Sequence, residues 1–221
     1  MDITKLDKRK VLFWDIDTQY DFLKPDGKLY VPDSQPIIDR ISRTRRLALD
    51  NGYSIVASTD YHSIDNEEIS LEPDMQKTFP PHCMKGEPGA ARVGDLGDLP
   101  VNYIESGVLN QPLVEDVCTR DQFHIVVRTD TVNMFDNPNT QLILKTVQPR
   151  LNIVFGVALD ICVNHAVEEL LKAGFGRIIL LTDVTKAIDD EAGEKYLQSF
   201  QQRNVRLATL NEIEQELICT C

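Results

Sequence analysis

The sequence predicts an α/β protein, a three-layer α-β-α sandwich around a mostly parallel sheet. Three observations support this class. Short apolar runs recur along the chain, stretches with helical spacing separate them, and the 221 residues suit one domain over 1–221. Strands that alternate with helices favour a parallel sheet covered on both faces, with right-handed crossovers.

The strands are expected where apolar residues run continuously, as in a strand buried on both faces. Six segments fit: 10–16, 53–58, 123–127, 153–155, 176–181 and 205–208. Helical spacing of apolar residues predicts helices over 36–51, 141–147, 162–172 and 190–202, and a last one that starts at Asn211. Residues 109–121 have no clear pattern. The segments 24–36 and 84–110 read as long loops that could cover a pocket or an interface.

Charge and composition narrow the classes of function. The net charge is −12, so binding to nucleic acid or to an anionic membrane through a basic patch is not expected. No apolar stretch approaches a membrane span of about 20 residues, and the polar start MDITKLDKRK does not resemble a signal peptide. The five cysteines lack CxxC spacing, which favours free thiols in a reducing compartment. We therefore expect a cytoplasmic location.

Cys162 is the candidate nucleophile. It follows the apolar run 153–155 and opens a helix, so it lies at a strand-to-helix turn. The free N–H groups and dipole of a helix start favour a thiolate, and they could hold an oxyanion after attack on a carbonyl. The alternative is that Cys162 is a small buried core residue.

Acidic residues follow the first strand. Asp15, Asp17 and Asp21 lie at its end, where catalytic groups collect in parallel sheets. A carboxylate there could accept the thiol proton of Cys162. The alternative is a polar loop in which an aspartate caps a turn.

A metal site is predicted after the second strand. Asp60 and His62, two residues apart, project to the same side of an extended backbone, and Glu68 and His82 follow. Carboxylate and imidazole ligands suit Zn²⁺ best, with Mn²⁺ or Fe²⁺ as alternatives. The spacing alone is a weak signal because acidic residues are abundant here, whereas two of the four histidines in one region strengthen it. Cys83 is interpreted as structural.

Two common motifs are missing from the sequence. No GxGxxG follows the first strand, so no nucleotide cofactor is expected, and no GxSxG nucleophile elbow is present.

Together these motifs resemble the isochorismatase-like cysteine hydrolases. The likeness rests on Asp17-x-Gln19-x-Asp21-Phe22, Asp60-x-His62, the run FPPHC at 79–83 with Gly86 and Gly89-Ala90 behind it, and GVALDICV at 156–163. GVALDICV marks the superfamily, and the predicted metal-site region with its FPPHC run points to the nicotinamidase branch of that superfamily. The resemblance covers about residues 10 to 190 and implies a Rossmann-like topology.

The resemblance implies a role for each motif residue. Cys162 would be the nucleophile and Asp17 its base. A cis peptide between Val157 and Ala158 would aim the N–H groups of Ala158 and Cys162 at an oxyanion. Four residues fall on or near the metal positions, Glu68 least securely: Asp60, His62, Glu68 and His82. Two aromatic residues would sandwich the substrate ring, Phe22 and Phe79. The metal would orient that ring.

One position departs from the resemblance. The third catalytic residue of the family is a lysine at the end of the strand that contains HIVV. Arg128 is the nearest match, which keeps the positive charge but cannot readily give up a proton. A register one residue later would place Thr129 there and lose the charge.

The resulting expectation is a C–N hydrolase of linear amides that converts nicotinamide or a similar small aromatic amide to the acid and ammonia, as in pyridine nucleotide (NAD) salvage. The partner would be the small-molecule amide, and the oligomeric state is left open. Alternatives are another amide, carbamoyl or ureido hydrolase, and a catalytically silent homologue that binds a small ligand. A vinyl-ether hydrolase is disfavoured because it would not need Cys162.

Overall fold

The computed structural model describes residues 3–218. These residues form one seven-stranded sheet in the order β3-β4-β2-β1-β5-β6-β7, and every neighbouring pair is parallel. Its strands are β1 (Val11–Ile16), β2 (Ser54–Asp60), β3 (Val101–Ile104), β4 (His124–Thr129), β5 (Leu151–Val157), β6 (Arg177–Lys186) and β7 (Arg206–Ala208). The predicted α/β class is therefore confirmed.

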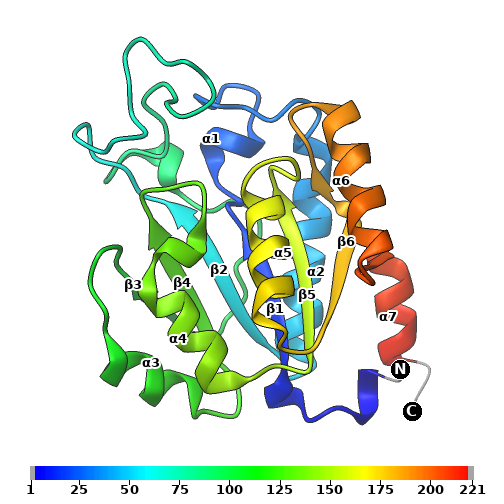
Figure 1. Ribbon diagram of the computed structural model, residues 1–221. Coiled ribbons are helices and arrows are strands. Elements are labelled where there is room, and N and C mark those ends of the chain that lie inside the picture. The colour runs from blue at the N-terminus through cyan, green and yellow to red at the C-terminus, as the bar shows by residue number, and fades with distance from the viewer. Residues whose placement is uncertain (1–2, 219–221) are drawn as a thin grey trace.

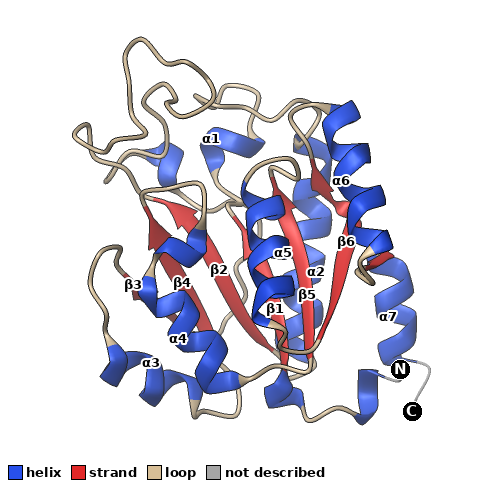
Figure 2. Ribbon diagram, in the orientation of Figure 1, coloured by secondary structure: helices blue, strands red, loops and turns tan. Residues whose placement is uncertain are grey.

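Helices cover both faces of the sheet (Figure 2). The larger ones are α2 (Ile38–Asp50), α3 (Gln111–Cys118), α4 (Pro138–Val147), α5 (Cys162–Ala173), α6 (Asp190–Gln202) and α7 (Leu210–Ile218), and α1 (Tyr20–Leu23) is a single turn. One apolar layer packs the sheet against α3, α4, α5 and α6. The other packs it against α2 and α7. Among the described helices, none combines the length and the hydropathy that a membrane span requires.

Strand β3, helix α3 and the single turn α1 were not predicted, and strands β5 and β6 were predicted too short. Strand β3 is an edge strand of four residues whose Tyr103 is 48% exposed, so it lacks a continuous apolar run. Helix α3 buries only Val114 and Val117, which explains the unclear pattern over 109–121. Strand β6 runs on to Lys186, past the expected end at 181, after a register irregularity against β5.

The connections between the strands determine where the candidate site lies on the sheet. The chain moves from the central strand β1 to β2 on one side and later returns to β5 on the other. The carboxyl ends of β1, β2, β4 and β5 therefore meet around this reversal of direction, where ligands bind in open α/β sheets. Figure 1 shows the long loops gathered at that same edge.

Candidate active site

Asp17 and Cys162 meet at the carboxyl edge of the sheet. Asp17 follows β1 with a positive φ of 47°, and its backbone N–H donates to Ser58 Oγ at 3.2 Å. Cys162 is the first residue of α5. The Asp17 carboxyl and the Cys162 thiol lie close enough to shift each other's pKa, and the backbone N–H of Ala158 lowers the pKa of the same thiol. The predicted base and nucleophile therefore lie side by side.

The turn before Cys162 has the predicted backbone. The Val157–Ala158 peptide is cis, as the resemblance implied. The Ala158 carbonyl oxygen accepts the N–H groups of Ile161 and Val163, which closes the turn around Cys162. Asp160 accepts the N–H groups of Ile188 and Asp189, both at 2.9 Å, and thereby ties the turn to the start of α6.

The electrostatics of the pair differ from expectation. Burial raises the pKa of the Cys162 thiol well above its usual value, and the carboxylates of Asp17 and Asp60 raise it further. Burial, followed by the Asp60 charge, also raises the pKa of Asp17. The expectation that the helix start alone favours a thiolate is therefore wrong, because a buried thiol between two carboxylates needs a nearby cation to ionise.

Arg128 does not provide that cation. Its guanidinium group lies 3.9 Å from the centre of the Tyr61 ring and 4.7 Å from that of Tyr103, and it pairs with Glu105. It lines a different cleft from the one that holds Cys162. The prediction that Arg128 acts beside Cys162 is corrected here: along β4, alternate side chains point to opposite faces, and Arg128 takes the far one.

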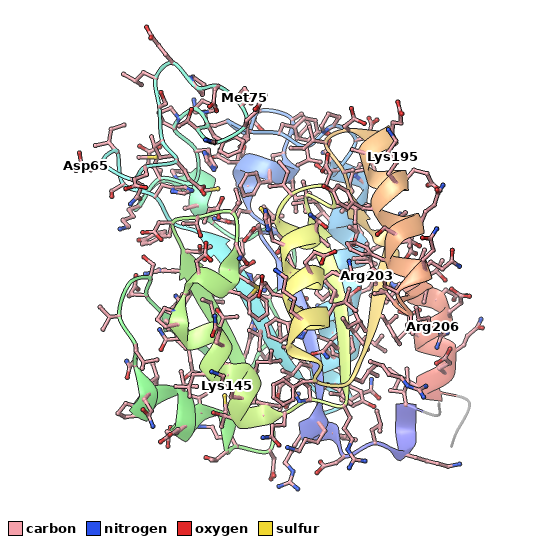
Figure 3. All side chains as sticks on the ribbon, viewed as in Figure 1. Asp65, Met75, Lys145, Lys195, Arg203 and Arg206 are labelled. Carbon is pink, nitrogen blue, oxygen red and sulfur yellow. The ribbon has the colours of Figure 1, made fainter. Side chains whose placement is uncertain are left out.

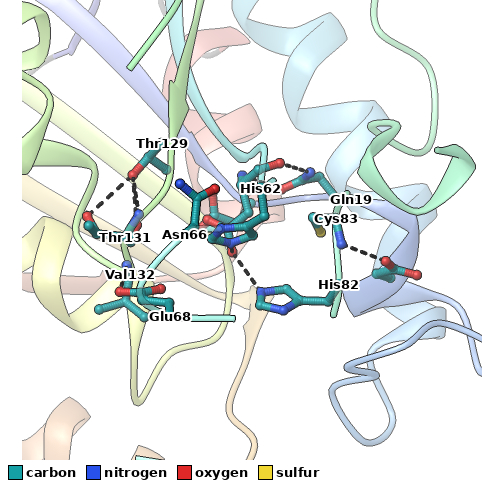
Figure 4. A network of polar contacts seen from close by, with 12 residues as sticks. Gln19, His62, Asn66, Glu68, His82, Cys83, Thr129, Thr131 and Val132 are labelled. Atoms are coloured by element: carbon teal, nitrogen blue, oxygen red, sulfur yellow. Dashed lines mark hydrogen bonds and ion pairs between the residues drawn. The ribbon is translucent and has the colours of Figure 1, made fainter. Parts of the chain in front are cut away.

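Thr129 occupies the place facing the site. It is the register partner of Asp60 across the parallel β2–β4 pair, so both side chains leave the sheet on the same face. Its hydroxyl donates to the Thr131 carbonyl oxygen at 2.7 Å, as Figure 4 shows. Among the described residues that line the cavity at Cys162, none is a lysine or an arginine.

Asp60, His62 and His82 converge on one point. Their ligand atoms all lie within 4.8 Å of one another, and all three side chains are buried. His82 Nε2 lies 3.3 Å and His62 Nε2 3.5 Å from Asp60 Oδ2. Both ring nitrogens of His62 and one Asp60 oxygen are buried without a hydrogen-bond partner. Such unsatisfied buried groups fit a bound metal ion.

The surroundings also favour ligation. His82 Nδ1 lies 2.8 Å from the Pro80 carbonyl oxygen, which fixes the proton on Nδ1 and leaves Nε2 free to bind. Gln19 clamps the Asp60 backbone, since its Nε2 donates to the Asp60 carbonyl oxygen and its Oε1 accepts the Asp60 N–H. Gln19 belongs to the motif Asp17-x-Gln19-x-Asp21, but the sequence assigned it no role.

Glu68 stands apart from the three converging ligands. One carboxylate oxygen accepts the Val132 N–H at 3.0 Å, as Figure 4 shows. Burial raises the pKa of Glu68, although the His62 and His82 charges oppose that shift. The structure therefore brings Asp60, His62 and His82 together, and Glu68 is not part of this cluster.

An apolar cavity adjoins Cys162. Phe22 and Phe79, the two predicted ring-binding residues, both line it, and the His82 ring lies 5.5 Å from that of Phe22. Aliphatic side chains that the sequence did not single out complete the wall: Leu29, Val31, Val132, Ile161 and Ile188. Their positions in loops gave no periodic signal. Leu29 and Val31 show that the segment 24–36 covers the pocket.

Comparison with known proteins agrees with this architecture. The model of the isochorismatase domain matches residues 104–212. The nicotinamidase/pyrazinamidase of Mycobacterium tuberculosis is 24% identical over 198 residues, covering 87% of this chain and 95% of that protein. The nicotinamidase of Saccharomyces cerevisiae is 26% identical, covering 80% and 88%. The crystal structure of the pyrazinamidase of Pyrococcus horikoshii in complex with zinc superposes with a TM-score of 0.70 at 25% identity, covering 91% of this chain and 99% of that one.

Residues 104–212 therefore match the isochorismatase domain, and the sheet has the fold of the isochorismatase-like structures. The chain is similar to the nicotinamidases and pyrazinamidases named above.

Proposed function

We propose that this protein is a cysteine amidohydrolase that converts nicotinamide, or a similar small aromatic amide, to the acid and ammonia. One observation carries the proposal: the Cys162 thiol neighbours the Asp17 carboxyl beside an apolar cavity. A thiol paired with a base is the arrangement that nucleophilic catalysis requires. The nicotinamidase relatives support the choice of amide.

In the proposed reaction, Asp17 takes the thiol proton and Cys162 attacks the amide carbon. The N–H groups of Ala158 and Cys162 face the oxygen that becomes negative. Asp17 then gives its proton to the leaving nitrogen, so ammonia departs and a thioester remains. Water, deprotonated by Asp17, hydrolyses the thioester to the acid. The raised pKa of Asp17 suits a group that accepts and returns a proton.

Asp60, His62 and His82 would hold a divalent metal ion, and their nitrogen and oxygen atoms suit zinc. When bound, the ion supplies positive charge beside Asp17 and Cys162 and a coordination position for a ring nitrogen. Phe22 and Phe79 would hold the ring, and the aliphatic wall would exclude water.

The test is ammonia release from nicotinamide by purified protein of known metal content. We expect turnover that Cys162→Ala abolishes. Cys118→Ala is the matched control, because Cys118 is a half-buried free cysteine in α3, outside the cavity at Cys162. Equal turnover by Cys162→Ala and the wild type would reject the thioester route. No turnover on nicotinamide or on any carbamoyl compound would reject the amidase.

A second candidate function is a ligand-binding protein without catalysis. The observation that favours it is Thr129, which stands where the resemblance implied a lysine, while Arg128 faces away. The intact pairing of Asp17 with Cys162 argues against it. Nicotinamide that binds but is not hydrolysed by the metal-loaded protein would support the second candidate.

A further inference from the structure

Asp21 is a buried carboxylate outside the reacting groups that joins two segments of the site. It lies in α1 and is 5% exposed. Its Oδ1 accepts the N–H of Lys28 at 3.0 Å, and its Oδ2 accepts the N–H of Cys83 at 2.7 Å. Each oxygen thus holds a different segment: residues 24–36, here called the flap, and residues 79–89, here called the metal loop.

The flap forms one wall of the cavity. Besides the Lys28 bond, the Asp21 carbonyl oxygen accepts the Leu29 N–H, and the Phe22 carbonyl oxygen accepts the Val31 N–H. Leu29 and Val31 both line the cavity. The anchor of the flap therefore influences ligand entry.

The metal loop carries His82 directly before Cys83. Cys83 has a positive φ of 44°, an unusual conformation that the Asp21 bond to its N–H helps to hold. The loop also packs closely on the carboxylate: a Cβ on Gly89 would lie 2.1 Å from Asp21 Oδ2. Figure 4 shows His82 beside Cys83, and the dashed line from the Cys83 N–H is the bond to the Asp21 carboxylate.

We infer that Asp21 is a positioning residue that fixes the metal loop and the flap to one carboxylate, so that its loss weakens metal binding through His82 and ligand binding through the flap. The inference rests on the proposed metal site and pocket. Partners that orient a metal ligand typically contribute 10- to 100-fold to metal affinity.

The test substitution is Asp21→Asn, which keeps the shape of the side chain but turns one acceptor into a donor. One of the two N–H groups then faces another donor. We expect the dissociation constant for zinc, measured by competition with a chelator, to rise about 10-fold or more. We also expect KM for nicotinamide to rise by more than kcat falls.

Asp74→Asn is the matched control. Asp74 accepts the N–H groups of Gln76, Lys77 and Thr78 in another loop and does not line the cavity. It should leave the zinc dissociation constant and KM within about twofold of wild type. If Asp21→Asn does not fold, Gly89→Ala disturbs the same contact from the loop side and should produce the same two changes.

The outcomes separate this inference from the proposed function. Folded Asp21→Asn and Gly89→Ala proteins with wild-type zinc affinity and KM would overturn it, even if their unfolding midpoints fell, because that pattern describes a purely structural residue. Wild-type protein without amidase activity would reject the proposed function, while the zinc titration would still decide the role of Asp21. Wild-type protein that binds no zinc would overturn both the metal site and this inference.

Discussion

At the scale of single residues, the charge around Cys162 decides how the site works. The described residues place two carboxyl groups, Asp17 and Asp60, near the thiol, and no lysine or arginine lines the cavity. Position after strands singled out Cys162 and the acids that follow the first strand, and the family resemblance chose Asp17 among those acids. It could not decide between Arg128 and Thr129, because a shift of one residue exchanges the two faces of a strand.

We predict that Thr129→Lys activates Cys162. An opposite charge within about 4–6 Å lowers a thiol pKa by roughly one to three units, so alkylation of Cys162 by iodoacetamide at pH 7 should accelerate about tenfold or more. Peptide mapping by mass spectrometry measures the rate at Cys162 alone. Arg128→Lys is the control and should change that rate less than about twofold, because Arg128 stacks on Tyr61 and Tyr103. The reverse pattern would show that Arg128 faces the thiol.

A second prediction concerns His124. Burial, followed by the Arg92 charge, lowers the pKa of His124 to about 3. Its ordinary value is about 6.5, so the folded state binds fewer protons than the unfolded state between these values. The stabilising contribution is fully present above about pH 6.5 and is lost as the pH falls toward 3. It amounts to about 2 kcal/mol between pH 7.5 and pH 5.

The measurement is urea unfolding at those two pH values. His124→Gln should remove this part of the pH dependence, because glutamine does not titrate and can still accept the bond from Arg92 Nη1, which lies 2.9 Å from His124 Nε2. An unchanged slope in the variant would mean that His124 does not cause it.

At the scale of elements, β5 shows most clearly how sequence and structure agree. Its apolar run predicted a buried strand, and all seven residues are buried. The glycine that ends the run has a reason that spacing alone does not reveal: Gly156 has a φ of 123°, and a Cβ there would lie 2.1 Å from the Ile16 carbonyl oxygen. Only glycine lets β5 approach β1 closely where Asp17 and Cys162 must meet.

Gly156→Ala should therefore destabilise the fold strongly, by about 3 kcal/mol or more, since a backbone clash adds to the conformational cost. Gly174→Ala is the matched control, because Gly174 also has a positive φ but a Cβ there meets nothing within 4 Å. It should cost about 1 kcal/mol. Chemical denaturation measures both, and equal effects would contradict the role of close packing.

The elements that the sequence pattern did not predict are those with little buried apolar surface. Strand β3 is short and lies at the sheet edge, and α3 buries two side chains. The residues that form the walls of the pocket were not predicted for a related reason. Leu29, Val31 and Val132 lie in loops, where neither helical nor strand periodicity marks which face is buried.

At the scale of the whole molecule, the α/β class and the general place of the site followed from the alternation of strands and helices. The convergence of Asp60, His62 and His82 could not follow from spacing alone, because 19 residues of loop separate the two histidines. Backbone contacts close that distance: His62 donates its N–H to the Cys83 carbonyl oxygen, and Lys85 donates its N–H to that of His62.

We predict that zinc stabilises the whole protein. An ion that binds the folded state alone adds about 2.7 kcal/mol when its free concentration is 100 times the dissociation constant. Thermal unfolding with zinc and with a chelator should show a clear difference in midpoint, which His62→Ala should abolish. A similar zinc effect in His62→Ala would place the ion elsewhere. Asp74→Asn serves as the control variant, because the Asp74 carboxylate makes its hydrogen bonds within its own loop and not with the three converging metal ligands.

The pairing of β1 with β5 affects when the site can form during folding. Asp17 follows β1 and Cys162 follows β5, and the register partners of these two strands, such as Val11 and Leu151, are separated by most of the chain. Closing so long a loop is slow compared with forming a helix. During synthesis or refolding, helices can form while the nucleophile and its base are still apart. The proposed amidase would therefore be inactive until the centre of its sheet is complete.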